Sequence, residues 1–291
     1  MRANSQGGHL PRCRGSEAVP VRMAPILLQS PAHYTAGEGE PGLDGTVGAW
    51  QSLRQQIESC TACPRLVAYR TAVARQGKRE FAGWTYWGRP VAGFGDLRAR
   101  LLIVGLAPAA HGANRTGRMF TGDPSARFLV SALYRADFAN QPFSERADDG
   151  LQLQDAFMTA PVRCAPPANR PLAEEARRCF PFLQAEFALL SRVRVLLALG
   201  RFAFDACRKL LAPALDEAQR AALRRARFAH GAVLRPGDGV PALVACYHPS
   251  RQNTQTGRLT PSMLDEVLAK VRTLLDGPEA APQAGGRPSA R

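Results

Sequence analysis

The sequence has 291 residues, of which 45% are hydrophobic, so it can bury a full-sized core and is not the composition of a disordered chain. Its formal net charge of +14 favours a polyanionic partner, because each neutralised phosphate releases counterions, although charge alone does not distinguish DNA, RNA and acidic membrane surfaces. No apolar run approaches the roughly 20 residues of a membrane span, and no signal peptide is recognisable at the N-terminus. We therefore expect a cytoplasmic protein without a membrane partner.

The two ends of the chain lack the periodicity of folded elements. Residues 1–46 mix Gly, Pro, Ser and Arg, and we predict a disordered extension in which Met23 is an alternative start. Residues 277–291, rich in Gly, Pro and Ala, are predicted to be a disordered tail. This leaves 47–276 as one folded domain. Its first part, 47–73, has the apolar spacing of two helical pieces joined at Cys60-Thr-Ala-Cys63-Pro64.

From residue 101 onward, apolar strand-like runs alternate with segments of helical periodicity. The predicted strands are 101–105, Ala156–Val162, Val193–Leu199 and Ala242–Tyr247, and the predicted helices are 125–136, Leu172–Leu190, Arg201–Leu211 and Pro261–Leu275. This alternation is typical of parallel strands with right-handed crossovers and helices on both faces. The predicted fold is α/β, a three-layer α/β/α sandwich with a short parallel central sheet.

One connection is too long for an ordinary strand-to-helix loop. The stretch GLAPAAHGANRTGRMFTGD, 105–123, follows the first predicted strand, where about two to six residues would suffice. Asp123 before Pro124 has the pattern of a helix N-cap. Because ligands of open α/β sheets bind at the carboxyl ends of the strands, this loop is a candidate site.

The last predicted strand runs into a second polar stretch, HPSRQNTQTGRLT, which begins at His248. Because the strands are predicted to be parallel, His248 should face the 105–123 loop across the same sheet edge. A lone histidine is often a structural residue, but the polar and cationic residues behind it favour contact with phosphates. Within the first loop, Arg115 and Arg118 either hold phosphates or face solvent, and the Arg-rich stretch 192–235 is interpreted first as a solvated helical face.

Seven cysteines in a chain of this type are not expected to form disulfides. Cys60 and Cys63 form a CxxC pair, and Cys164 and Cys179 form a second pair, so four soft ligands indicate zinc or an iron–sulfur cluster. Cys207 and Cys246 lie in apolar patterns and are predicted to be core residues.

Over approximately residues 50–275, the sequence resembles the type-5 uracil-DNA glycosylases. The resemblance is carried by the two loop motifs, by the stretch VRCAPPAN that lies between them, and by the four cysteines. The resemblance implies a 4Fe-4S cluster held by Cys60, Cys63, Cys164 and Cys179. It also implies a base excision repair enzyme that flips a deaminated base out of single- or double-stranded DNA and hydrolyses its N-glycosidic bond. We expect a monomer that removes uracil and also hypoxanthine and xanthine.

Specific roles follow from the same resemblance. The catalytic residues implied are Asp123, His248 and Asn169; those lining the base site are Gly105, Ala107, Ala109, His111 and Phe120; those contacting DNA are Arg251, Gln252 and Asn253. Classical uracil-DNA glycosylases carry GQDPY in the first motif, so their Asp and Tyr fall at Ala107 and Ala109 here. The smaller side chains, with Ala160 where type-4 enzymes carry Asn, predict a roomier and less selective site.

Two further hypotheses fit the residues without the resemblance. The charge and the cysteines are equally compatible with a zinc-stapled nucleic-acid-binding module that has no catalytic activity. A hydrolase of free nucleotides is the third alternative.

Overall fold

A six-stranded sheet forms the centre of residues 43–277, the part of the chain that this computed structural model describes. The strands are β1 (Phe94–Gly95), β2 (Leu101–Val104), β3 (Ala156–Thr159), β4 (Val195–Leu199), β5 (Val233–Leu234) and β6 (Ala242–Cys246). In the order β1-β3-β2-β4-β6-β5, the central strands pair in parallel, while β1 and β5 pair antiparallel at the two edges. The predicted parallel sheet is confirmed in its centre, and the sequence analysis missed both edge strands.

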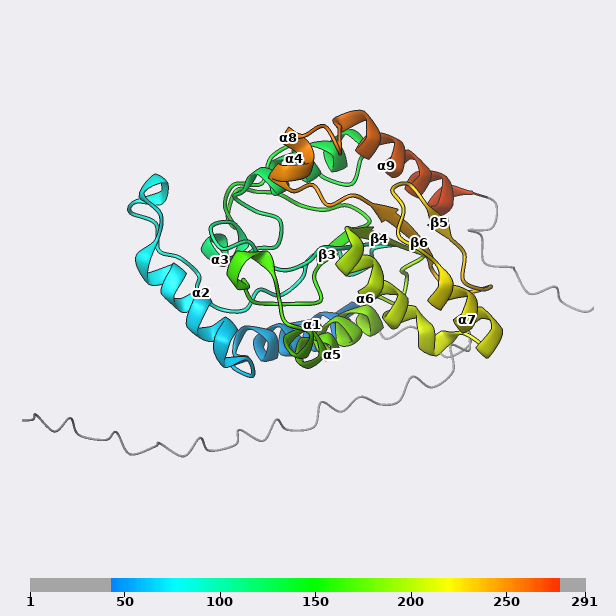
Figure 1. The fold of residues 1–291 in the computed structure, drawn as a ribbon, viewed down its shortest axis with the longest axis horizontal. Coiled ribbons are helices and arrows are strands. Elements are labelled where there is room, and N and C mark those ends of the chain that lie inside the picture. Colours follow the sequence, from blue (N-terminus) through cyan, green and yellow to red (C-terminus); the bar gives the residue numbers. More distant parts are fainter. Residues whose placement is uncertain (1–42, 278–291) are drawn as a thin grey trace, which may run out of the picture. The chain divides into compact units, whose positions relative to one another are not determined.

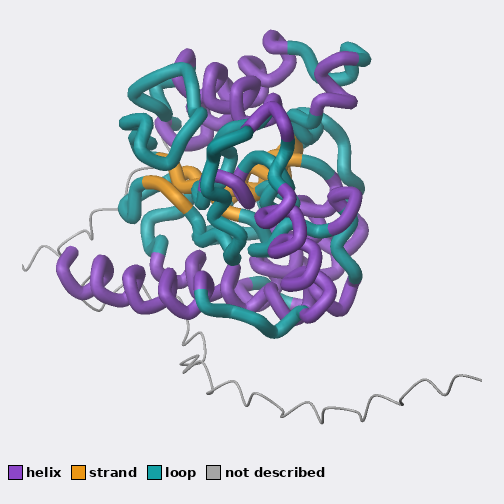
Figure 2. The backbone as a smooth tube through the Cα atoms, turned by 90° about the vertical axis from the view of Figure 1, so that its left-hand side faces the viewer, coloured by secondary structure: helices purple, strands orange, loops and turns teal. Residues whose placement is uncertain are grey.

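Helices cover both faces of this sheet (Figure 1). They are α1 (Leu43–Glu58), α2 (Pro64–Gln76), α3 (Ala113–Thr116), α4 (Pro124–Arg135), α5 (Ala173–Leu189), α6 (Arg201–Leu211), α7 (Glu217–Arg225), α8 (Arg251–Gln255) and α9 (Pro261–Asp276). Short 3₁₀ turns lie at Arg79–Phe81, Pro167–Asn169 and Ala212–Ala214. The expected three-layer sandwich is confirmed, with long loops between the layers (Figure 2).

Alternate side chains of each central strand enter different cores. In β2, Leu101 and Ile103 pack with α4 and α9, whereas Leu102 and Val104 pack on the opposite face with α5 and α6. All four side chains have 0% exposure, which explains why the strand reads as a continuous apolar run. The buried thiols of Cys207 and Cys246 belong to these cores, as predicted.

Element boundaries differ from the predictions where local chemistry intervenes. β3 ends at Thr159, before Val162, because Pro161 has no N–H to donate to a ladder. α1 begins at Leu43, inside the segment predicted to be disordered. The predictions for 1–42 and 278–291 lie outside the described residues. Within 43–277, no helix is long and apolar enough to span a membrane.

A buried ion pair joins α5 to the end of β3. Arg163 and Glu186 are each 1% exposed, and Arg163 Nη2 donates to Glu186 Oε2 at 2.7 Å. Arg163 Nη1 also donates to Thr159 Oγ1 at 2.6 Å, and Glu186 Oε1 accepts the N–H of Gly93 at 2.9 Å. The pair therefore ties together three segments that are distant in the sequence.

Glu186→Ala should destabilise the protein by about 3–5 kcal/mol, because it leaves the Arg163 charge buried without its partner. The free energy of unfolding is measured by urea titration. Asp265→Ala, which breaks the exposed Arg135–Asp265 pair, is the matched control and should cost less than about 1 kcal/mol. Equal losses in the two variants would contradict the importance of the buried pair.

Candidate active site at the carboxyl edge of the sheet

The predicted site residues gather where the central parallel strands end. Gly105 follows β2, Gly200 follows β4, and His248 lies two residues after β6. Because β4 lies between β2 and β6, the end of β4 is the point where the two polar loops can meet.

The aromatic ring of Phe120 packs against the backbone that leaves β2. A Cβ atom at Gly105 would lie 2.6 Å from Phe120 Cζ, so only glycine permits this close approach. Phe120 itself has a φ of 47°, a left-handed conformation that is unfavourable for a bulky side chain. Such strain is concentrated at functional sites, and here it holds a half-buried aromatic ring at the sheet edge.

His248 reaches over the end of β4 in a similar way. Gly200 has a φ of 90°, and a Cβ atom there would approach His248 Cβ to 3.2 Å. Asn253 of α8 donates from Nδ2 to the His248 carbonyl oxygen at 2.8 Å, which fixes the backbone, while the ring has no hydrogen-bond partner within residues 43–277. Burial lowers the pKa of His248 to about 4, so the ring is uncharged at neutral pH. One ring nitrogen is then an available donor.

Asp123 combines a helix cap with a half-buried carboxylate. Its Oδ1 accepts the N–H of Ala126 at 3.0 Å and so caps α4, as predicted. The other oxygen, Oδ2, packs closely against Gly112. A Cβ atom at position 112 would lie only 2.1 Å from this oxygen, so the approach requires glycine there. Burial raises the pKa of Asp123, and the amides of the cap and the nearby Arg115 oppose that shift. A carboxylate in this setting can both cap a helix and accept a proton.

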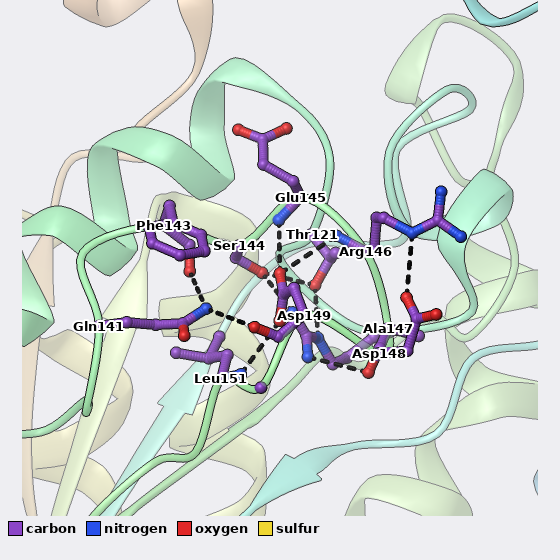
Figure 3. Close-up of polar contacts among 12 residues, drawn as sticks. Thr121, Gln141, Phe143, Ser144, Glu145, Arg146, Ala147, Asp148, Asp149 and Leu151 are labelled. Carbon is purple, nitrogen blue, oxygen red and sulfur yellow. Dashed lines mark hydrogen bonds and ion pairs between the residues drawn. The ribbon is translucent and has the colours of Figure 1, made fainter.

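A buried network fixes the segment that carries Phe120 and Asp123 (Figure 3). Arg118 donates from Nε to Thr121 Oγ1 at 2.9 Å and from Nη2 to Asp149 Oδ1 at 2.7 Å. Ser144 accepts a hydrogen bond from Arg118 at Oγ, and its carbonyl accepts the N–H of Gly122 at 2.8 Å. The loop between α4 and β3 therefore supports the candidate site from outside, a role that the sequence did not reveal.

Arg115 and Arg118 do not have either of the roles that the sequence suggested. They are 3% and 6% exposed, so neither faces solvent nor presents a free cation to a phosphate. Arg115 donates to the carbonyl oxygens of His111 and Gly122, both at 2.8 Å. Both arginines stabilise irregular backbone instead.

The remaining predicted residues are spread around this edge. Ala107 packs against the core cluster that contains Cys164, and Ala109 accepts the backbone N–H of Asn114 at 3.0 Å. His111 Nδ1 lies 3.1 Å from the Tyr86 hydroxyl oxygen. Asn169 is exposed, with a left-handed φ of 55°, and its side-chain amide has no partner among the described residues, while its backbone N–H donates to the Pro166 carbonyl oxygen.

The α8 helix, which directly follows His248, carries the three residues expected to contact DNA. Arg251 and Gln252 are exposed. Asn253 is partly buried, and its amide nitrogen is used to hold His248. Arg251 and Gln252 are therefore available to a partner, whereas Asn253 acts at least in part within the protein.

The four predicted ligand cysteines line a single cavity. Cys60 and Cys63 come from the α1–α2 connection, Cys164 follows β3, and Cys179 lies in α5. Within residues 43–277, no group of three or more His, Cys, Asp or Glu side chains is arranged to hold one metal ion. Burial raises the pKa of Cys164 and of Cys179 to about 12. Sequence spacing thus identified residues that the fold brings together.

Buried guanidinium groups adjoin this cavity. The backbone N–H of Arg163 donates to Cys179 Sγ at 3.3 Å. Arg70 is 5% exposed and donates to the carbonyl oxygens of Gly88 and Cys60. Its Nε has no partner, and it forms no ion pair with a carboxylate among the described residues. Such a buried cation calls for a nearby negative charge.

A separate surface cavity of about 700 Å³ lies between the C-terminal end of α4 and α9. Its lining includes Arg135, Arg272 and Asp265, and the first and last of these form an ion pair. It contains none of the residues singled out above. The carboxyl edge of the sheet is therefore the better candidate for chemistry.

The fold and the site together define an α/β protein with candidate catalytic groups at the carboxyl edge of a parallel sheet. The family model described as "Uracil DNA glycosylase superfamily" matches residues 92–272. The chain is 52% identical to the type-5 uracil-DNA glycosylase of Mycobacterium leprae over 80% of this chain and 98% of that protein. It is 50% identical to the type-5 uracil-DNA glycosylase of Thermus thermophilus over 77% of this chain and 97% of that protein. It is 44% identical to the type-5 uracil-DNA glycosylase of Pyrobaculum aerophilum over 77% of this chain and 92% of that protein. The chain therefore belongs to the uracil DNA glycosylase superfamily, among the type-5 uracil-DNA glycosylases.

Proposed function

We propose that this protein removes uracil, and also hypoxanthine and xanthine, from DNA by hydrolysing the N-glycosidic bond and leaving an abasic site. The observation that carries the proposal is that His248, which follows β6, packs over Gly200 at the end of β4, while Phe120 packs over Gly105 at the end of the neighbouring strand β2. A flipped base could stack on the Phe120 ring while His248 reaches its edge. The names of the relatives support uracil as one substrate.

His248 would act on the charge that develops in the leaving base. When the bond between C1′ and the base breaks, the electron pair stays with the base, and uracil O2 becomes more negative. A hydrogen bond from the neutral imidazole N–H to O2 then stabilises the transition state more than the ground state. Because the ring has no partner among the described residues, that donor is free for the base.

Asp123 would position the attacking water. The water oxygen forms a bond to C1′ and passes a proton to the carboxylate, while the leaving base is protonated by solvent. Burial raises the pKa of Asp123, which makes it a better proton acceptor than an exposed carboxylate. Asn169 would supply a second polar group near the base. It lies in the loop after β3, at the same edge of the sheet.

Asp123→Asn should lower the single-turnover rate of uracil release at least about 100-fold, because the amide cannot accept the proton. The melting temperature should hardly change, since Asn is also a good N-cap. His248→Ala should lower the rate about 100- to 1000-fold through loss of one hydrogen-bond donor. Asp265→Asn, on the exposed face of α9, is the control and should react at the wild-type rate. Near-wild-type rates in both site variants would refute the assigned roles.

The small side chains at Ala107, Ala109 and Ala160 support a broad choice of base. Where a stricter enzyme has a Tyr whose bulk excludes the methyl group of thymine, this chain has Ala109, and the smaller side chain would give a roomier site. The wild-type enzyme should therefore release hypoxanthine and xanthine as well as uracil from duplex DNA. The assay follows abasic-site formation on the three duplexes. A preparation that is active on uracil but inactive on both purines would contradict the broad specificity, and one inactive on all three would contradict the glycosylase activity.

The cysteine cavity is the proposed site of a 4Fe-4S cluster. Four thiols line it, and such a cluster binds each thiolate through a different iron. The buried Arg70, with its unpartnered Nε, would balance the negative charge of such a centre. Hydrolysis transfers no electrons, so the cluster would contribute stability, joining the α1–α2 connection to the loop after β3.

Protein purified without oxygen should be brown and contain iron and acid-labile sulfide in equal amounts. Cys164→Ser should lose the visible absorbance, because it removes one of the ligands. The matched control is Cys207→Ser, which changes a thiol that is 0% exposed in the core between the sheet and α6, and this variant should retain the colour. Stoichiometric zinc without iron would contradict the cluster and favour the zinc alternative.

A further inference from the structure

We propose that the segment Lys78–Arg89, here called the aromatic arm, is a second contact of this protein with the DNA backbone. It lies between α2 and β1 and stands beside α3 in Figure 1. The inference rests on the proposed function, because it extends the DNA contact of α8 across the candidate active site. The contact would be with phosphates and would carry no sequence information.

The aromatic arm is attached directly to the loop that follows β2. The backbone N–H groups of Trp87 and Gly88 donate to the carbonyl oxygens of Arg115 and Asn114, both at 3.0 Å. The Trp87 ring lies so close to Gly117 that a Cβ atom there would be 3.0 Å from it. The arm and the candidate site thus form one unit.

Arg115 fixes the aromatic side chains of the arm. Its guanidinium carbon lies 3.9 Å from the centre of the Phe81 ring and 4.1 Å from that of Trp84. A desolvated cation between aromatic faces is a strong contact. The guanidinium carbon of the exposed Arg146 also lies 4.6 Å from the centre of the Trp84 ring. The arm therefore has a defined shape, even though most of it is irregular backbone.

Lys78 of the arm is paired with Glu80, but the two arginines of the arm are not neutralised within the described residues. Arg79 and Arg89 are exposed, and neither forms an ion pair or hydrogen bond through its side chain within residues 43–277. The Arg89 guanidinium stacks on the Trp87 ring at 3.7 Å. Stacking orients the planar group while leaving its N–H edges free for phosphate oxygens. By contrast, the exposed Arg127 and Arg135 are paired with Glu145 and Asp265.

A DNA duplex is the partner that this arrangement fits. Unpaired cations occur on both sides of the candidate site: Arg79 and Arg89 on the arm, and Arg251 and Arg258 beyond β6. The arm is joined to the loop after β2, whereas α8 follows β6, and β4 separates those two strands. A duplex bound over the carboxyl edge would meet cations on either side of the flipped nucleotide. An acidic protein partner would not require this placement around the site.

The test is the double variant Arg79→Ala/Arg89→Ala, compared with Arg225→Ala/Arg227→Ala. The control removes the same charge from exposed, unpaired arginines at and beyond the end of α7, which is remote from α3 in Figure 1. Fluorescence anisotropy measures the Kd for a uracil-free duplex across a series of NaCl concentrations. A second assay measures single-turnover release of uracil at saturating enzyme.

The arm variant should bind about tenfold more weakly at low salt, and the slope of log Kd against log salt should fall by about 2, because two phosphate contacts are lost. The control should keep the wild-type slope, and all three proteins should release uracil at similar saturated rates. An unchanged slope in the arm variant, or an equal fall in the control, would overturn the inference while leaving the glycosylase proposal intact. Failure of the wild-type protein to release uracil would instead overturn the proposed function.

Discussion

Buried guanidinium groups hold together the irregular segments from which the site is built. Arg70, Arg115, Arg118 and Arg163 are 5%, 3%, 6% and 1% exposed. A guanidinium has five N–H donors and no acceptor, so burying one is costly unless carbonyl or carboxylate oxygens surround it. Most of those oxygens come from irregular segments, namely the carbonyls of Gly88, His111, Gly122 and Ala147 and the carboxylate of Asp149, whereas Glu186 lies in α5. Satisfying the buried charges therefore determines the paths of the loops.

The candidate catalytic groups depend on that scaffold and on close approach at glycines. Phe120 is held in a left-handed conformation against Gly105, and the Arg118 network fixes the residues that follow it. His248 approaches Gly200, and Asp123 approaches Gly112. The proposed chemistry depends on these three groups, namely an aromatic face, an uncharged hydrogen-bond donor and a half-buried carboxylate.

The cysteine cavity and the candidate active site share the same supports. Arg163 contacts Cys179 through its backbone and Thr159, at the end of β3, through its side chain. Ala107, in the loop after β2, packs against the cluster that contains Cys164. A structural cofactor in this cavity would therefore stabilise the loops of the site without entering the reaction.

The sequence by itself determined the central strands, the long helices, the cap at Asp123 and the set of four cysteines. These follow from local periodicity and spacing, which depend little on distant residues. Two features depend on the tertiary structure and could not be predicted from local sequence patterns. They are the antiparallel edge strands, each only two residues long, and the burial of Arg115 and Arg118. In a sequence, an arginine in a polar loop looks like a surface residue. Its environment is set by carbonyls, carboxylates and aromatic rings that only tertiary contacts bring to it.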